Sequence, residues 1–241
     1  ENGANTSFVN RIVDESLAIA DLVADPVTTV ASFSPKAHPR IPLPADLFGA
    51  ERKNSQGINM ADDNALRELA ASIHAAVHAA RDGWEAFPLV PGKNGVSGKP
   101  ISITNPADRR ETVGEYVSAD AALVDKALSI AVAAQPAWDR GGIEPRAAAL
   151  DRAADLMEHH RGELIALCVR EAGKTIPAAV SEVREADFCR YYAQQARAQF
   201  AAPETLPGPT GESNRLVLHG RGVFVCISPW NFPLAIFMGQ V

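Results

Sequence analysis

The feature that most constrains this chain is an apolar run that leads into a turn bounded by two prolines. The run from Val223 to Ile227 is typical of a buried strand in a parallel sheet. Pro229-Trp230-Asn231-Phe232-Pro233 follows it almost directly. Open α/β sheets bind ligands beyond the carboxyl ends of their strands, so we expect this turn to line a functional site.

Asn231 is the side chain in this turn with the clearest chemical use. An amide held on a rigid turn can donate a hydrogen bond to a developing oxyanion, as in acyl-transfer chemistry. We therefore take Asn231 as the candidate catalytic residue. The alternative is a proline-stiffened turn in which Asn231 satisfies only nearby backbone groups. The residues alone leave both interpretations open.

The strand and turn resemble the aldehyde dehydrogenase superfamily, in which Pro-Trp-Asn-Phe-Pro follows a strand of the nucleotide-binding domain. The resemblance extends back to about Lys99. Pro100 to Pro106 is similar to the family's opening hairpin, and Glu171-Ala172-Gly173-Lys174-Thr175 is similar to its Glu-x-Gly-Lys segment. Gly211 to Arg215 and Phe232 resemble the glutamate semialdehyde (pyrroline-5-carboxylate) dehydrogenase branch.

The first residues of the chain resemble a different enzyme. Residues 1–11 are similar to the tail of the last barrel helix of a proline dehydrogenase. A proline dehydrogenase end followed by a semialdehyde dehydrogenase beginning is the arrangement of the bifunctional proline utilization A family. This resemblance implies oxidation of proline with FAD, oxidation of glutamate semialdehyde with NAD, and channelling between the two sites.

The resemblance also implies roles for particular residues. Asn231 would be the oxyanion donor, and Phe232 and Glu185 would line the aldehyde site. Glu185 is separated from Asp187-Phe188 by one residue where the family more often has two, and the alternative is a solvent-facing helix charge. The candidate cofactor residues are Ile227, Ser228, Pro229 and Trp230 for NAD, and Glu1, Thr6 and Phe8 for FAD. The family's nucleophilic cysteine and general base are expected beyond Val241.

Charge and composition limit the kinds of ligand and partner that this segment is expected to bind. The net charge is -6 and the basic residues are not clustered, which argues against nucleic acid as a partner of this segment. Cys168, Cys189 and Cys226 are widely spaced among apolar neighbours, so we expect buried reduced thiols rather than disulfides or a metal site. His74 and His78 share a helix face but lack a third ligand.

No leader or membrane span is predicted, and we expect a cytoplasmic protein that acts on small molecules and self-associates. Membrane association of the whole enzyme is left open.

The pattern along the chain predicts an α/β fold that is mostly helical. We expect four parts: residues 1–24, the tail of the proline dehydrogenase barrel; 25–62, a proline-rich linker; 63–98, a connecting helix and loop; and 99–241, the first part of a Rossmann-like aldehyde dehydrogenase domain. Strands are expected at 101–104, 112–117, 216–218 and 223–227, and the longest helix at 175–200.

Two other functions are compatible with the residues. One is a monofunctional NAD-dependent aldehyde dehydrogenase with an N-terminal extension. The other is a non-catalytic linker or oligomerisation module. Residues 1–11 argue against the first, because a monofunctional enzyme has no use for the tail of a flavin barrel.

Overall fold

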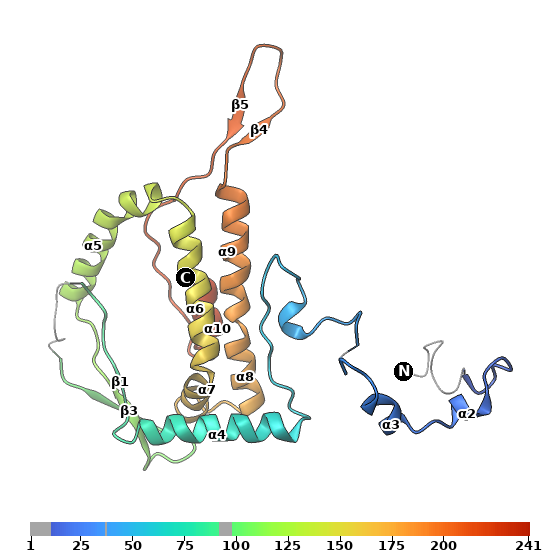
Figure 1. Cartoon of the computed structure of the whole chain (residues 1–241). Coiled ribbons are helices and arrows are strands. Elements are labelled where there is room, and N and C mark those ends of the chain that lie inside the picture. The colour runs from blue at the N-terminus through green and yellow to red at the C-terminus, as the bar shows by residue number, and fades with distance from the viewer. Residues whose placement is uncertain (1–10, 37, 92–97) are drawn as a thin grey trace. The chain divides into compact units, whose positions relative to one another are not determined.

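A computed structural model describes residues 11–36, 38–91 and 98–241 (Figure 1). The chain divides into two compact units, residues 1–43 and 44–241. The described part of the first unit holds two short helices, α2 (Ile19–Leu22) and α3 (Pro26–Ala31), neither with a buried residue. Helix α3 lies within residues 25–62, which were predicted to be a proline-rich linker. It forms because Pro26 occupies the first turn, where no backbone donor is needed, and Asp25 caps Val27 and Thr28.

The second unit is built mainly from helices. After a 3-10 turn at Pro44–Asp46, its helices are α4 (Asp63–Ala79), α5 (Ala121–Arg140), α6 (Glu144–His159), α7 (Arg161–Arg170), α8 (Ile176–Arg184), α9 (Ala186–Phe200) and α10 (Ala235–Gln240). Its strands are β1 (Trp84–Ala86), β2 (Ile101–Thr104), β3 (Thr112–Tyr116), β4 (Glu204–Leu206) and β5 (Asn214–Leu216). Helices with two small sheets confirm the predicted α/β class.

The expected hairpin at 101–117 forms and joins a third strand. Strand β3 pairs antiparallel with β2 and parallel with β1, giving the order β1-β3-β2. Side chains tie this sheet to α7: the Trp84 indole N–H donates to Glu163 Oε1 at 3.0 Å, and Glu111 pairs with Arg170. The sheet is therefore held against the helices that carry the core.

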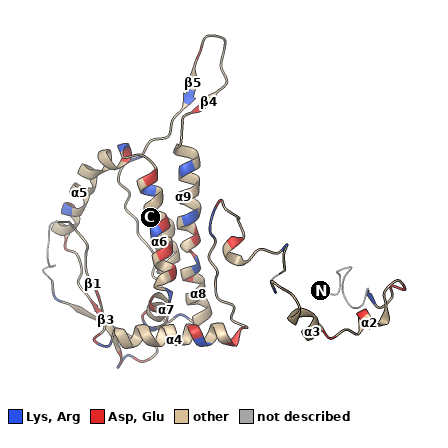
Figure 2. Ribbon diagram, viewed as in Figure 1, with Lys and Arg blue, Asp and Glu red and all other residues tan. Residues whose placement is uncertain are grey.

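The core lies where α4, α7 and α8 meet and continues between α6 and α9. The buried residues of the first cluster are Leu69, Ile165, Cys168, Ala179 and Val183, and those of the second are Ala154, Met157, Ala186 and Cys189. Helices α6 and α9 run side by side (Figure 1). Both helices carry acidic and basic residues (Figure 2). The buried Arg190 of α9 pairs with Asp155 at 2.9 Å and Glu158 at 2.5 Å on α6.

The long helix expected at 175–200 is broken at Glu185. The backbone bonds there span three residues, from Glu185 N to Glu182 O and from Phe188 N to Glu185 O. Helix α8 packs in the cluster with α4 and α7, whereas α9 packs in the cluster with α6. The break lets the two halves face different partners, a tertiary effect that periodicity along one segment does not reveal.

The expected strands near the end of the chain differ from the structure. The strand predicted at 216–218 lies two residues earlier, as β5 (Asn214–Leu216), and it pairs with β4, a strand that was not predicted. Residues 223–227 form no strand and are exposed, with Ile227 at 83%. A parallel strand needs neighbours to pair with, and none lies beside this segment within the described residues. Cys226, expected to be buried, is exposed for the same reason.

Candidate functional site

The turn that carries Asn231 lies between the exposed segment 223–227 and helix α10. Trp230 and Asn231 are in a hydrogen-bonded turn, and both side chains face solvent. Among the described residues, the Asn231 amide makes no hydrogen bond, so its donors remain available to a ligand. In the described residues the Asn231 amide therefore does not bond the nearby backbone, and its role as an oxyanion donor stays a prediction.

A buried carboxylate fixes the C-terminal side of this turn. Glu182 of α8 is 2% exposed, and its Oε2 accepts hydrogen bonds from the backbone N–H groups of Leu234 at 3.2 Å and Ala235 at 2.8 Å. These N–H groups belong to the first turn of α10, where a helix has no carbonyl partner of its own. Glu182 thus attaches the turn to a helix that precedes it by about fifty residues.

Lys174 completes this attachment. Gly173 has a φ of +66° and ends α7, and the Lys174 N–H bonds the Cys168 carbonyl at 3.1 Å. Gly173 is therefore a C-terminal glycine cap of α7. The Lys174 Nζ lies 2.8 Å from Glu182 Oε1 and 4.8 Å from the centre of the Phe232 ring. One ammonium group is shared between a buried carboxylate and an aromatic ring of the turn.

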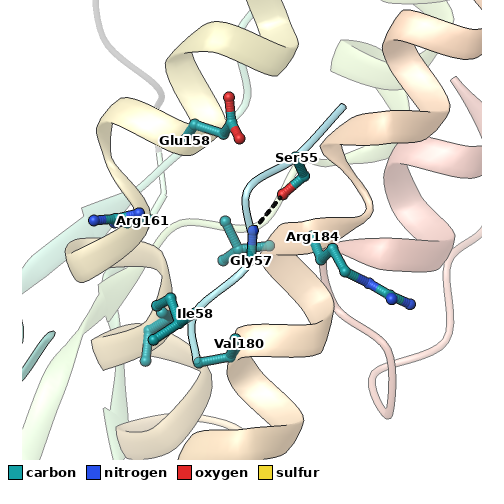
Figure 3. Close-up of a pocket in the computed structure, with 9 residues that line it drawn as sticks. Ser55, Gly57, Ile58, Glu158, Arg161, Val180 and Arg184 are labelled. Atoms are coloured by element: carbon teal, nitrogen blue, oxygen red, sulfur yellow. Dashed lines mark hydrogen bonds between the residues drawn. The ribbon is translucent and has the colours of Figure 1, made fainter. Parts of the chain in front are cut away.

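An apolar pocket of about 370 Å³ opens beside the turn. Its lining residues are Leu164, Leu167, Cys168, Glu171 and Ala172 of the α7 region, and Trp230, Pro233 and Leu234 of the turn. A second cavity, lined by Ser55, Ile58 and Val180 among others, has a volume of about 20 Å³, enough for one water molecule (Figure 3). Only the first of these two has the size of a small-molecule site.

Cys168 lines this 370 Å³ pocket, but its surroundings disfavour the thiolate that a nucleophile requires. Burial, reinforced by the negative charge of Glu182, raises the pKa of the Cys168 thiol to about 11. Burial also raises the pKa of the Cys189 thiol. A thiol must ionise to attack a carbonyl group, so both act as small apolar core residues.

Glu185 does not reach the turn through any described contact. It lies at the break between α8 and α9, its side chain is 25% exposed, and its nearest charged partner is Arg184 at 4.0 Å. The glutamate that contacts the turn is Glu182, three residues earlier. Neither Glu182 nor the side chain of Lys174 was singled out by the sequence. Their positions in the sequence were the available signal: Lys174 directly follows the glycine that caps α7, and Glu182 lies on the next helix, α8.

The four candidate NAD residues form one continuous strip. Ile227 and Trp230 are 83% and 79% exposed. Gln240 of α10 holds the strip, because its Nε2 donates to the Ile227 carbonyl at 3.1 Å and its Oε1 accepts from Ser228 Oγ at 2.9 Å. The candidate FAD residues Glu1, Thr6 and Phe8 lie outside the described residues.

Within residues 11–36, 38–91 and 98–241, no group of three His, Cys, Asp or Glu side chains is arranged to hold a metal ion. No helix in the same ranges is long and apolar enough to cross a membrane.

More than half of the chain matches a known protein family. The model of the aldehyde dehydrogenase family matches residues 93–241. The bifunctional protein PutA of Escherichia coli K12 is 44% identical over 248 residues, covering 100% of this chain and 18% of that protein. The chain thus spans about a fifth of the length of this relative.

Two solved structures of similar proteins are also similar to this chain in fold. A crystal structure of proline utilization A from Bradyrhizobium japonicum is 41% identical and has a TM-score of 0.69, covering 100% of this chain and 21% of that one. A 1-pyrroline-5-carboxylate dehydrogenase from Thermus with bound NAD is 31% identical with a TM-score of 0.68, covering 78% of this chain and 36% of that one.

Proposed function

The chain belongs to the aldehyde dehydrogenase family, and from this membership we propose that it is part of a bifunctional proline-catabolic oxidoreductase. The full protein oxidises proline with FAD and then glutamate semialdehyde with NAD. This chain joins the two catalytic domains and supplies the oxyanion donor of the second. Its substrates are small molecules, the full protein self-associates, and it works in the cytoplasm.

The extent of the similarity supports a bifunctional protein over a monofunctional one. The similarity to PutA runs through the whole chain, including the residues before the family match begins at residue 93. The similarity to 1-pyrroline-5-carboxylate dehydrogenase of Anoxybacillus flavithermus covers only 64% of the chain. The first third of the chain therefore has a counterpart in the two-activity protein.

The observation that carries the catalytic proposal is the exposed amide of Asn231 on a turn fixed by Glu182. In the full site this amide donates to the aldehyde oxygen as negative charge develops there. Phe232, held by Lys174, forms an aromatic wall for the substrate chain. A donor that is already oriented stabilises the transition state more than a donor that must be oriented during the reaction.

The strip from Ile227 to Trp230 fits a dinucleotide. It offers exposed apolar side chains beside a backbone segment that Gln240 holds in place. Bound NAD supplies a hydride acceptor, and the part of this chain is to bind and orient it. On the same proposal, Glu1, Thr6 and Phe8 contact FAD, the electron acceptor for proline oxidation, and Glu185 lies near the aldehyde substrate.

The substitution Asn231→Ala in the full-length protein tests this function. It removes one oxyanion donor, so kcat for semialdehyde oxidation should fall by about 10²- to 10³-fold. Oxidation of proline, measured with an artificial electron acceptor, should be unchanged because the flavin site lies in another domain. The measurement is steady-state formation of NADH beside proline-dependent dye reduction.

Asn54→Ala is a matched control, because it removes an amide of the same chain that binds only the backbone of residues 44 and 55. It should leave both activities near those of the wild type. The proposal is wrong if Asn231→Ala oxidises the semialdehyde within a few-fold of wild type, or if the wild-type protein shows neither activity.

A further inference from the structure

We propose that Glu182, paired with Lys174, is a positioning residue that sets the location of Asn231 and Phe232. The inference rests on the proposed function, since it concerns the same turn. It assigns a role to two side chains that do not themselves contact the reacting atoms.

The first step is the geometry of Glu182. Its two oxygens have separate tasks: Oε2 accepts from the Leu234 and Ala235 N–H groups, and Oε1 lies 2.8 Å from the Lys174 ammonium. Leu234 is three residues from Asn231, with Pro233 between them restricting the backbone. Movement of the carboxylate would therefore pass almost directly to the catalytic amide.

The second step is the placement of Lys174. Its side chain is only 14% exposed, and it faces the Phe232 ring as well as Glu182. Lys174 contacts Phe232, the residue directly after Asn231. Glu182 contacts Leu234 and Ala235, which follow a little later in the chain. Together the two side chains hold the segment Phe232 to Ala235 at several points.

The third step is charge. Glu182 is buried, so its negative charge requires a partner, and Lys174 is the cation that the structure provides. A surface carboxylate could bond the same N–H groups, but solvent and side-chain freedom would weaken the attachment. A buried ion pair that also binds two backbone N–H groups is harder to displace than a surface carboxylate. A catalytic group must be held in one place, and this arrangement does so.

The test uses Glu182→Gln in the full-length protein, alone and combined with Asn231→Ala. Glutamine keeps one acceptor oxygen but removes the charge that Lys174 neutralises. We expect kcat for semialdehyde oxidation to fall about 10- to 100-fold, with KM for NAD changed less than about threefold. If Glu182 acts through Asn231, the double variant should be no slower than Asn231→Ala alone.

Two controls separate positioning from general damage. Glu158→Gln removes another ion-paired carboxylate, on α6, and should retain the wild-type kcat because Glu158 pairs with Lys53 and Arg190 away from the turn. If Glu182→Gln does not fold, the pair Glu182→Gln with Lys174→Gln removes both buried charges and should restore folding while kcat stays low.

The outcomes are distinct from those of the functional proposal. A wild-type protein without semialdehyde activity contradicts the function itself. A wild-type protein with activity contradicts only the positioning role if Glu182→Gln retains kcat within twofold. The same conclusion follows if the effects of Glu182→Gln and Asn231→Ala multiply, or if the charge-free double variant folds and has the wild-type kcat.

Discussion

At the scale of single residues, the Cys168 thiol is a group whose acid–base chemistry the fold changes strongly. It is 4% exposed, lies in the core cluster with Ile165 and Ala179, and faces the negative charge of Glu182. Both burial and that charge oppose the thiolate, which raises the pKa of the thiol from its ordinary value of 9.0 to about 11. In the unfolded chain the same thiol ionises at its ordinary pKa.

This difference predicts a loss of stability in alkali. The thiol's contribution is fully present below pH 9 and is lost as the pH rises towards 11, because the unfolded chain then binds fewer protons. Two pH units correspond to roughly 2 to 3 kcal/mol of unfolding free energy. Urea unfolding from pH 8 to 11 should show this loss in the wild type and a flatter profile in Cys168→Ala. Cys226→Ala, which removes an exposed thiol, should follow the wild type; parallel profiles for all three would contradict the prediction.

The same scale shows what the sequence could predict of the site. Asn231 was identified because an amide between two prolines after an apolar run has a recognisable chemical use. Glu182 was not, because its importance comes from two backbone N–H groups more than fifty residues later in the chain. Glu185 was named instead because its segment resembles one in the family, although its spacing to Asp187-Phe188 differs from the family pattern by one residue.

At the scale of elements, the pairing of α6 with α9 depends on a buried cation. Arg190 is 4% exposed and bonds Asp155 and Glu158, with Asp187 at 3.7 Å on its own helix. Arg197, farther along α9, bonds Glu144 and Asp151 but is 35% exposed. Both arginines link α6 to α9 by ion pairs and differ mainly in burial. Comparing their substitutions therefore tests the effect of burial.

Their substitution should therefore have unequal effects. Arg190→Met removes the buried cation that bonds Asp155 and Glu158, and leaves Glu158 only the more distant Lys53 ammonium at 3.8 Å. It should cost about 2 to 3 kcal/mol of unfolding free energy. Arg197→Met acts near the surface and should cost about 1 kcal/mol or less. Urea unfolding of the chain at neutral pH measures both. Equal losses would show that burial does not decide the strength of these ion pairs.

Three helix starts in this chain follow a local rule, whereas the break between α8 and α9 and the exposed segment 223–227 do not. Asp62, Asp120 and Thr175 cap α4, α5 and α8 with their own side chains, which is a signal confined to a few residues. The break at Glu185 and the exposure of residues 223–227 depend on which surfaces lie nearby. Periodicity describes one segment at a time and carries no record of its neighbours.

At the scale of the whole molecule, part of the linker is attached to the second unit. Arg52 lies 4.0 Å from the centre of the Phe48 ring and 5.4 Å from that of Tyr191 on α9. Ser55 is buried, and its N–H donates to Asp187 at 2.7 Å. Prolines had predicted a stiff linker, but these contacts with α9, more than 130 residues away, fix residues 44–62 through packing as well as through restricted backbone angles.

Because residues 44–62 pack on α9 and do not form a loose tether, we expect the full-length protein proposed above to transfer the semialdehyde within one particle. When the full-length protein receives proline, NAD and an electron acceptor, NADH should form without a measurable lag. The matched control is a mixture of the Asn231→Ala variant with protein stripped of its flavin, in which the intermediate must cross the solvent and a lag must appear. Equal lags in the two experiments would mean that the product of the first reaction equilibrates with the solvent, and that the attachment of residues 44–62 to α9 serves stability alone.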